Sequence, residues 1–148
     1  MIDTTLRPVS AAETRPLRHR ILRPHQRVED VALPHDEDVD TLHLGAFVDG
    51  VMIGTATVHR EALPGTTDPN AWRLRGMATE PDARRRGCGS KLVAGCVEHA
   101  KKHGGSRMWC TARETAKGFY DALGFATIGD PFDIPDVGPH YVMELTFS

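Results

Sequence analysis

Residues 84–90 read Arg84-Arg85-Arg86-Gly87-Cys88-Gly89-Ser90, which brings three cationic side chains and two glycines together. The apolar residues that follow have the spacing of one helix face: Leu92, Val93, Cys96, Val97 and Ala100. That helix is expected to end at Gly104-Gly105. The first backbone N–H groups of a helix lack intrahelical partners, the helix dipole adds positive potential, and glycines let an anion approach the backbone. The stretch therefore predicts a phosphate-binding loop and a phosphorylated cofactor.

Two other phosphate-binding motifs do not fit this loop. A Walker loop needs Gly-Lys-Ser/Thr, whereas Gly89-Ser90-Lys91 reverses the last two residues. A dinucleotide fingerprint needs a third glycine where Leu92 stands. A solvated basic turn that leads into a helix is the remaining alternative, and the loop alone leaves it open.

The length of the chain predicts a single domain, and its net charge predicts a small-molecule or peptide partner. The 148 residues fit one domain, residues 1–148, with a core large enough to fold alone. A net charge of −2 gives no basic face for nucleic acid or an anionic membrane, so the arginines form a local site. Cys88, Cys96 and Cys110 have no C-x-x-C spacing and accompany no signal peptide or long apolar run, which predicts a cytoplasmic location.

Strand and helix signals alternate in a mixed order, which predicts an α/β fold. The expected strands cover residues 4–8, 42–49, 51–59, 72–78, 107–111, 125–128 and 141–147. Asp49-Gly50, between the second and third of them, is a strong signal for an antiparallel hairpin. Residues 130–140, rich in proline and aspartate, are expected to form a long ordered loop.

The first helix has two plausible starts. Residues 10–13 have the spacing of a capping box, but Pro16 lies deep for an undisturbed helix that begins there, so a start near Thr14 is the alternative. Arg18 is expected among the cations around this helix. A third helix is expected over residues 116–123, after the one that follows the phosphate loop.

Two blocks of sequence resemble one known family. Residues 84–89 resemble the pyrophosphate loop of the GNAT-superfamily N-acetyltransferases, Arg/Gln-x-x-Gly-x-Gly/Ala. Residues 111–125 resemble a later block of that family, with its Ala, Phe-Tyr and Gly-Phe in register, and the likeness covers about residues 72–128. Residues 17–22 and 138–143 more loosely resemble the ElaA-like group of small GNAT proteins. The resemblance implies a mixed central sheet, splayed between the fourth and fifth strands, with flanking helices.

The resemblance also implies a cofactor and its contacts. Acetyl-CoA would be the co-substrate and no metal is expected; pantetheine would bind backbone groups, and the pyrophosphate would bind the arginine-glycine loop. Arg113 stands where the family commonly has Asn, beside the pantetheine arm. The expected cofactor-binding residues are Met77, Ala78, Thr79, Arg84, Arg85, Arg86, Gly87, Cys88, Gly89, Ser90, Arg113 and Tyr120.

The resemblance assigns the general acid more readily than the general base. Tyr120 would protonate the leaving thiolate, although its spacing also suits a packed helical aromatic. Arg73 stands where some family members have a catalytic Glu, so no carboxylate is supplied there. His59 and His140 are the candidate bases because imidazole can take up a proton near neutral pH, while Glu61 and Glu80 are weaker candidates.

The acceptor is expected to bind on the strand before the loop. Strand alternation places Arg73, Arg75 and Met77 on one face, and the resemblance implies that this face lies toward the acceptor. Arg73 or Arg75 would then bind a carboxylate or phosphate of the acceptor, with His140 at the same site. The alternative is that both arginines pair with the acidic 36–40 loop or reach solvent. Asp36, Asp38 and Asp40 imitate part of a calcium loop, but its turn glycine and bidentate glutamate are missing.

These features together predict an N-acetyltransferase that acts on a primary amine of a small molecule or peptide. A CoA-binding module without catalysis is the alternative, because Arg73 and Arg113 both depart from the catalytic pattern. A domain that binds acids or proteins without CoA is a third. The acceptor and the oligomeric state are left open, with a homodimer as one option.

Overall fold

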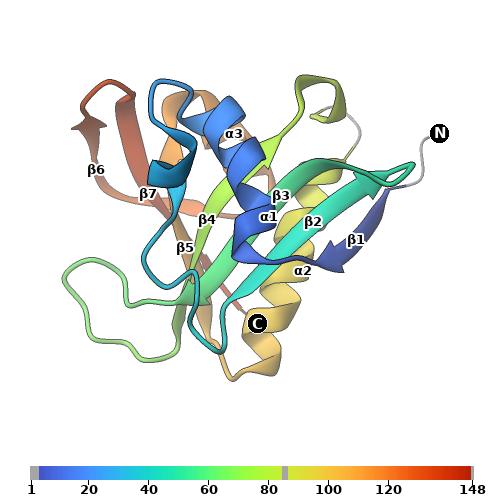
Figure 1. Cartoon of the computed structure of the whole chain (residues 1–148). Coiled ribbons are helices and arrows are strands. Elements are labelled where there is room, and N and C mark those ends of the chain that lie inside the picture. The colour runs from blue at the N-terminus through green and yellow to red at the C-terminus, as the bar shows by residue number, and fades with distance from the viewer. Residues whose placement is uncertain (1–3, 85–86, 148) are drawn as a thin grey trace. The chain divides into compact units, whose positions relative to one another are not determined.

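A computed structural model describes residues 4–84 and 87–147, which form a mixed sheet with flanking helices (Figure 1). The strand order is β1-β2-β3-β4-β5-β7-β6, with β4 parallel to β5. In chain order the elements are β1 (Thr5–Pro8), α1 (Ala11–Leu17), the π-helical η1 (Arg18–Leu22), the 3-10 helix η2 (Val28–Val31), β2 (Leu42–Val48), β3 (Val51–Arg60), β4 (Ala71–Thr79), η3 (Pro81–Ala83), α2 (Cys88–Lys102), β5 (Arg107–Arg113), η4 (Glu114–Ala116), α3 (Lys117–Ala122), β6 (Ala126–Ile134) and β7 (Gly138–Thr146). The expected mixed α/β sheet is confirmed.

The chain forms two compact units, and the division falls inside β3, β4 and α2. Unit one contains residues 1–59 and 74–99, and unit two contains residues 60–73 and 100–148. Within the described ranges, no helix combines the length and the apolar composition that crossing a bilayer requires.

Unit one is built on the predicted hairpin of β2 and β3, with β1 paired to the other edge of β2 (Figure 1). Asp49 and Gly50 form its turn, with φ angles of 51° and 79°. Two successive left-handed residues give a turn whose twist matches that of the strands, which explains why Asp-Gly is favoured there. The hairpin prediction is confirmed.

The two faces of this hairpin meet different helices. His43 and Thr57 lie opposite each other in the register, so their side chains share one face, while Leu44 and Ala56 share the other. Helix α2 packs on the second face, where a Cβ added at Gly95 would lie 2.6 Å from Leu44. The α1–η1 segment packs on the first face.

Helix α1 starts at the capping box and not near Thr14. The Ser10 hydroxyl accepts from the Glu13 N–H at 3.1 Å, and the Glu13 carboxylate accepts from the Ser10 N–H at 3.0 Å. Pro16 stands inside the helix, where it removes one backbone donor, and the helix continues in π-helical geometry from Arg18. The cap therefore determines the start despite the deep proline.

Arg18 is buried instead of lying among surface cations, with 2% of its surface exposed. Its guanidinium donates to both oxygens of Asp36, at 2.7 and 3.1 Å, and to the Thr57 hydroxyl at 2.8 Å. Burial alone would raise the pKa of the Asp36 carboxyl, but hydrogen bonds from Arg18 and from the Leu33 N–H hold that pKa below its ordinary value. The pair ties the segment before β2 to the α1–η1 helix.

Unit two is built on antiparallel β5–β7 and β6–β7 pairs, and the first residues of β4 pair with the first residues of β5. The loop predicted over residues 130–140 is wrong. Strand β6 continues to Ile134, and β7 begins at Gly138 after a short turn. Pro131 is tolerated because β6 is the outermost strand of the sheet order, and the register shifts between Ile128 and Phe132.

Candidate active site

The predicted pantetheine-binding segment is the end of β4, in unit one. Ala78 is buried, whereas Met77 and Thr79 are half-buried. The Glu80 N–H donates to the Ile53 carbonyl at 2.8 Å, which holds this end of β4 against β3. Backbone groups of β4 are thus held in place directly before the phosphate loop.

The phosphate loop connects η3 to the start of α2. Gly87 has a φ of 76°, and its carbonyl accepts from the Lys91 N–H at 3.1 Å, so Gly87 directly precedes the first helical turn. A Cβ added at Gly87 would meet no atom of the described residues within 4 Å, so they leave the space beside this backbone open. Arg84 and Ser90 are exposed and Gly89 is buried, while the predicted contacts Arg85 and Arg86 lie outside the described residues. This geometry suits an anion.

The three cysteines are buried thiols and not activated nucleophiles. The Cys88 side chain lies against Gly54 of β3, where an added Cβ would be 2.8 Å from its sulfur. Burial raises the pKa of Cys88 and raises the pKa values of Cys96 and Cys110 to about 12. Any cofactor contact of Cys88 would therefore come from its backbone at the start of α2.

Tyr120, the predicted general acid, lies on α3 in unit two. Its ring is buried and makes edge contacts with Phe119 and Phe125, with ring centroids 5.0 and 5.3 Å apart. The Phe125 N–H donates to the Tyr120 carbonyl at 3.1 Å, which ends the helix. These contacts explain why an aromatic ring is buried at this position. A test of the general-acid role must therefore remove the hydroxyl and keep the ring.

His140 and Arg113 lie opposite each other in the β5–β7 register, also in unit two. His140 is buried, with 3% of its surface exposed. Its Nδ1 lies 2.8 Å from the Gly138 carbonyl, so Nδ1 carries the proton and donates it there. This bond orients the ring and leaves Nε2 as the nitrogen with a lone pair when the imidazole is neutral.

Arg73 and Arg75 have different surroundings. Arg73 forms an ion pair with Glu61 at 3.0 Å and lies over the Trp109 ring, 4.5 Å from its centroid. Arg73 therefore pairs with Glu61, whereas the alternative given in the sequence analysis was a pairing with the acidic 36–40 loop. Arg75 is half-buried in unit one. A guanidinium already neutralised by a carboxylate attracts a second anion weakly, so the ion pair with Glu61 weakens the case for Arg73 as a contact to an anionic acceptor.

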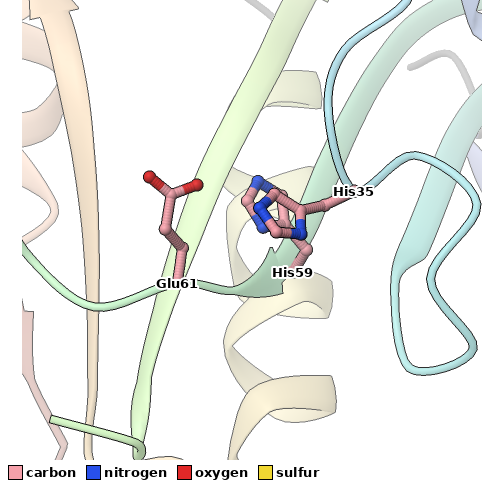
Figure 2. A group of neighbouring side chains, drawn as sticks. All are labelled: His35, His59 and Glu61. Atoms are coloured by element: carbon pink, nitrogen blue, oxygen red, sulfur yellow. The ribbon is translucent and has the colours of Figure 1, made fainter. Parts of the chain in front are cut away.

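His59 stacks on a residue that the sequence analysis did not single out. The ring centroids of His59 and His35 lie 4.6 Å apart with planes 15° from parallel, and Figure 2 shows the rings face to face. His35 Nδ1 lies 2.7 Å from a carboxylate oxygen of Asp38. The spacing of His35 and Asp38 is a signal in the sequence, but the aspartates of this loop had been interpreted as an imitation of a calcium loop or as partners of Arg73 and Arg75.

This histidine pair is poorly arranged for a metal ion. Ring-nitrogen lone pairs lie in the ring planes, so those of two stacked imidazoles run side by side instead of converging. The carboxylate of Glu61, which also appears in Figure 2, is paired with Arg73. A cation beside that carboxylate disfavours a second cation. The stacking is therefore better explained by packing or by proton chemistry.

Comparison with known proteins gives the class. The model of the acetyltransferase (GNAT) family matches residues 10–125, and this chain belongs to that family. It is 40% identical over 141 residues to the uncharacterized N-acetyltransferase YitI of Bacillus subtilis (strain 168), and the alignment covers 95% of each protein. The GNAT resemblance seen in the two sequence blocks is confirmed.

Solved structures agree with the fold. Ard1 from Thermoplasma volcanium superposes with a TM-score of 0.77 at 17% identity, over 97% of each chain. The structure of yncA from Salmonella typhimurium with its cofactor acetyl-CoA has a TM-score of 0.72 at 16% identity, over 97% of this chain and 93% of that one.

Proposed function

We propose that this protein is an acetyl-CoA-dependent N-acetyltransferase that transfers the acetyl group directly to a primary amine. The observation that carries the proposal is the open, left-handed turn at Gly87, between the β4–η3 segment and the start of α2, in a member of the GNAT family. Both β4 and α2 run from one unit into the other, which supports one acetyltransferase domain over residues 1–148.

The residues present fit the cofactor. Acetyl-CoA would supply an acetyl group activated as a thioester, with its pyrophosphate at the start of α2. As the amine nitrogen bonds to the thioester carbon and the C–S bond breaks, negative charge develops on the oxygen. A backbone N–H of Met77 or Ala78 would stabilise that charge. The Tyr120 hydroxyl would give its proton to the leaving thiolate.

The second candidate function is a CoA-binding module without catalysis. Arg73 and Arg113 favour it, because neither supplies the group that the catalytic pattern of the family has there. Release of the CoA thiol in the presence of a primary-amine panel separates the two functions. An increase in melting temperature on adding CoA, without thiol release, would support the module.

Replacing Gly87 with Leu is expected to raise the dissociation constant for acetyl-CoA at least about tenfold, or roughly 1.4 kcal/mol. The added side chain would enter the open space at the start of α2 and obstruct the pyrophosphate. Calorimetric titration measures the change.

Gly104→Leu is the matched control for this variant. Gly104 also has a positive φ, 82°, and open space around an added Cβ. It follows the other end of the 15-residue helix α2. If both variants raise the dissociation constant for acetyl-CoA equally, backbone strain explains the Gly87 effect, and Gly87 does not lie at the phosphate-binding site.

Arg75→Ala is expected to raise KM more for an anionic amine than for an otherwise similar neutral amine. The proposed reason is a charge-assisted hydrogen bond between the guanidinium and a carboxylate or phosphate of the acceptor. Steady-state kinetics with a matched amine pair, such as an amino acid and its amide, measures the difference. A preference of the parent protein for polycationic amines would contradict this acceptor class.

A further inference from the structure

Acetyl transfer requires a group that takes the proton from the attacking amine. The two histidines that the sequence suggested are both buried, since His59 has 1% and His140 has 3% of its surface exposed. A base must come within hydrogen-bond reach of the proton that it removes, either directly or through one water. An imidazole that acts as the base must therefore be both accessible to the amine and held in a fixed orientation.

His35 has these two properties. Its side chain is 40% exposed, and Nδ1 is bound to the Asp38 carboxylate at 2.7 Å. A carboxylate at Nδ1 fixes the proton on that nitrogen, so the lone pair of the neutral ring is on Nε2. Stacking on the buried His59 ring sets the plane of the His35 ring (Figure 2).

The backbone of His35 is held in a strained conformation. Its φ is 73°, which is uncommon for a residue with a side chain. The His35 carbonyl accepts from the Thr41 hydroxyl at 2.6 Å and from the Asp38 N–H at 3.1 Å. The next residue, Asp36, is held by the buried Arg18. Strain persists only where its surroundings enforce it, and such enforcement is concentrated at functional sites.

The same contacts connect this loop to the proposed cofactor segment within unit one. Arg18, the partner of Asp36, lies against Gly76, where an added Cβ would be 2.7 Å from Arg18 Nε. Gly76 directly precedes Met77 on β4. The loop that carries His35 is thus joined through one guanidinium to the strand whose backbone is proposed to bind the thioester.

We propose that His35 is the general base of the acetyl transfer, with Asp38 as its orienting carboxylate. The lone pair of the amine nitrogen forms the bond to the acetyl carbon, the N–H bond breaks as its proton passes to His35 Nε2, and the C–S bond breaks as the thiolate leaves with that electron pair. Two titratable groups contact the His35 side chain: the Asp38 carboxylate and the His59 ring. The Arg18–Asp36 ion pair begins at the next residue of the chain, and Glu61 follows His59 by two residues. This assignment rests on the proposed acetyltransferase function.

The test uses His35→Asn, His35→Ala and Asp38→Asn, with His19→Ala as the control. Asparagine tolerates a positive φ and can still donate to Asp38, so His35→Asn removes Nε2 while keeping the loop. His19 is an imidazole whose Nε2 lies 2.6 Å from a backbone carbonyl, that of Gln26, instead of a carboxylate. CoA thiol release is measured with ethanolamine, spermidine and alanine amide as acceptors, alongside calorimetric titration with acetyl-CoA.

We expect both His35 variants to lose about 10²-fold in kcat, with acetyl-CoA affinity unchanged. Added imidazole should restore thiol release in His35→Ala, because a small base can enter the vacated space. Asp38→Asn should lose less, and His19→Ala should lose nothing. Full activity of His35→Asn, or no rescue by imidazole in a folded His35→Ala, would overturn the assignment. No thiol release by the parent protein with any acceptor would overturn the proposed function itself.

Discussion

Asp36→Asn is expected to lower the free energy of unfolding by about 3–5 kcal/mol, because it leaves the buried Arg18 guanidinium without its counter-charge. Only 2% of the Arg18 side chain and 5% of the Asp36 side chain are exposed, so water cannot replace the lost carboxylate. Urea unfolding of the parent and the variant, extrapolated linearly to water, measures the difference.

Asp30→Asn is the matched control for that variant. Asp30 also binds an arginine through both oxygens, at 3.1 and 3.4 Å, but its Arg27 partner is 75% exposed. Exposed ion pairs contribute about 0–1 kcal/mol. Similar losses in the two variants would mean that burial does not set the strength of the Arg18–Asp36 pair.

The contribution of Asp36 should also depend on pH. Its pKa is lower in the folded protein than the ordinary value of 3.8, so the stabilisation is fully present above that value and is lost as pH falls through the folded pKa. The difference in unfolding free energy between parent and Asp36→Asn should therefore be constant above about pH 5 and shrink below about pH 4. A difference that grows on acidification would contradict the lowered pKa.

Tyr120→Phe is expected to lower kcat about 10²-fold, or roughly 2.7 kcal/mol, with little change in acetyl-CoA affinity. The substitution keeps the ring and its edge contacts with Phe119 and Phe125, and removes only the proposed proton donor. Pre-steady-state thiol release, under conditions where the chemical step limits the rate, measures the effect.

Tyr141→Phe controls for the loss of a tyrosine hydroxyl. Tyr141, on β7, is the other tyrosine of the chain, and its ring faces the Lys117 ammonium at 5.7 Å. Deleting its hydroxyl should leave kcat close to that of the parent. If Tyr120→Phe is equally active, Tyr120 is a core aromatic and the thiolate takes its proton from another donor.

Local signals were enough to predict most of the fold. The Asp49-Gly50 turn, the capping box at Ser10 and the face of α2 each depend on residues a few positions apart, and the structure has all three. The strand residues of 130–140 were missed because proline and aspartate disfavour strands locally, whereas an edge strand accepts them. Local rules carry no information about which edge of a sheet a segment will occupy.

The missed parts of the candidate site depend on contacts between distant residues. Arg18 and Asp36 are far apart in sequence, and nothing around Arg18 in the sequence distinguishes it from a surface cation. His35 becomes notable only when the fold places it on His59, from the end of β3. The phosphate loop could be proposed from the sequence because its glycines and cations are contiguous and their chemistry is local, and its anion-binding role stays a prediction.

The burial of Cys88, Cys96 and Cys110 has a practical result at the bench. Thiol-reactive dyes attack thiolates, and these side chains are both shielded and protonated in the native protein. A colorimetric reading of free sulfhydryl during turnover should therefore report the coenzyme product without a background from the protein. As denaturant unfolds the protein, the same three thiols become exposed and react with the dye. One reagent can therefore measure product formation in the folded protein and unfolding at higher denaturant concentration.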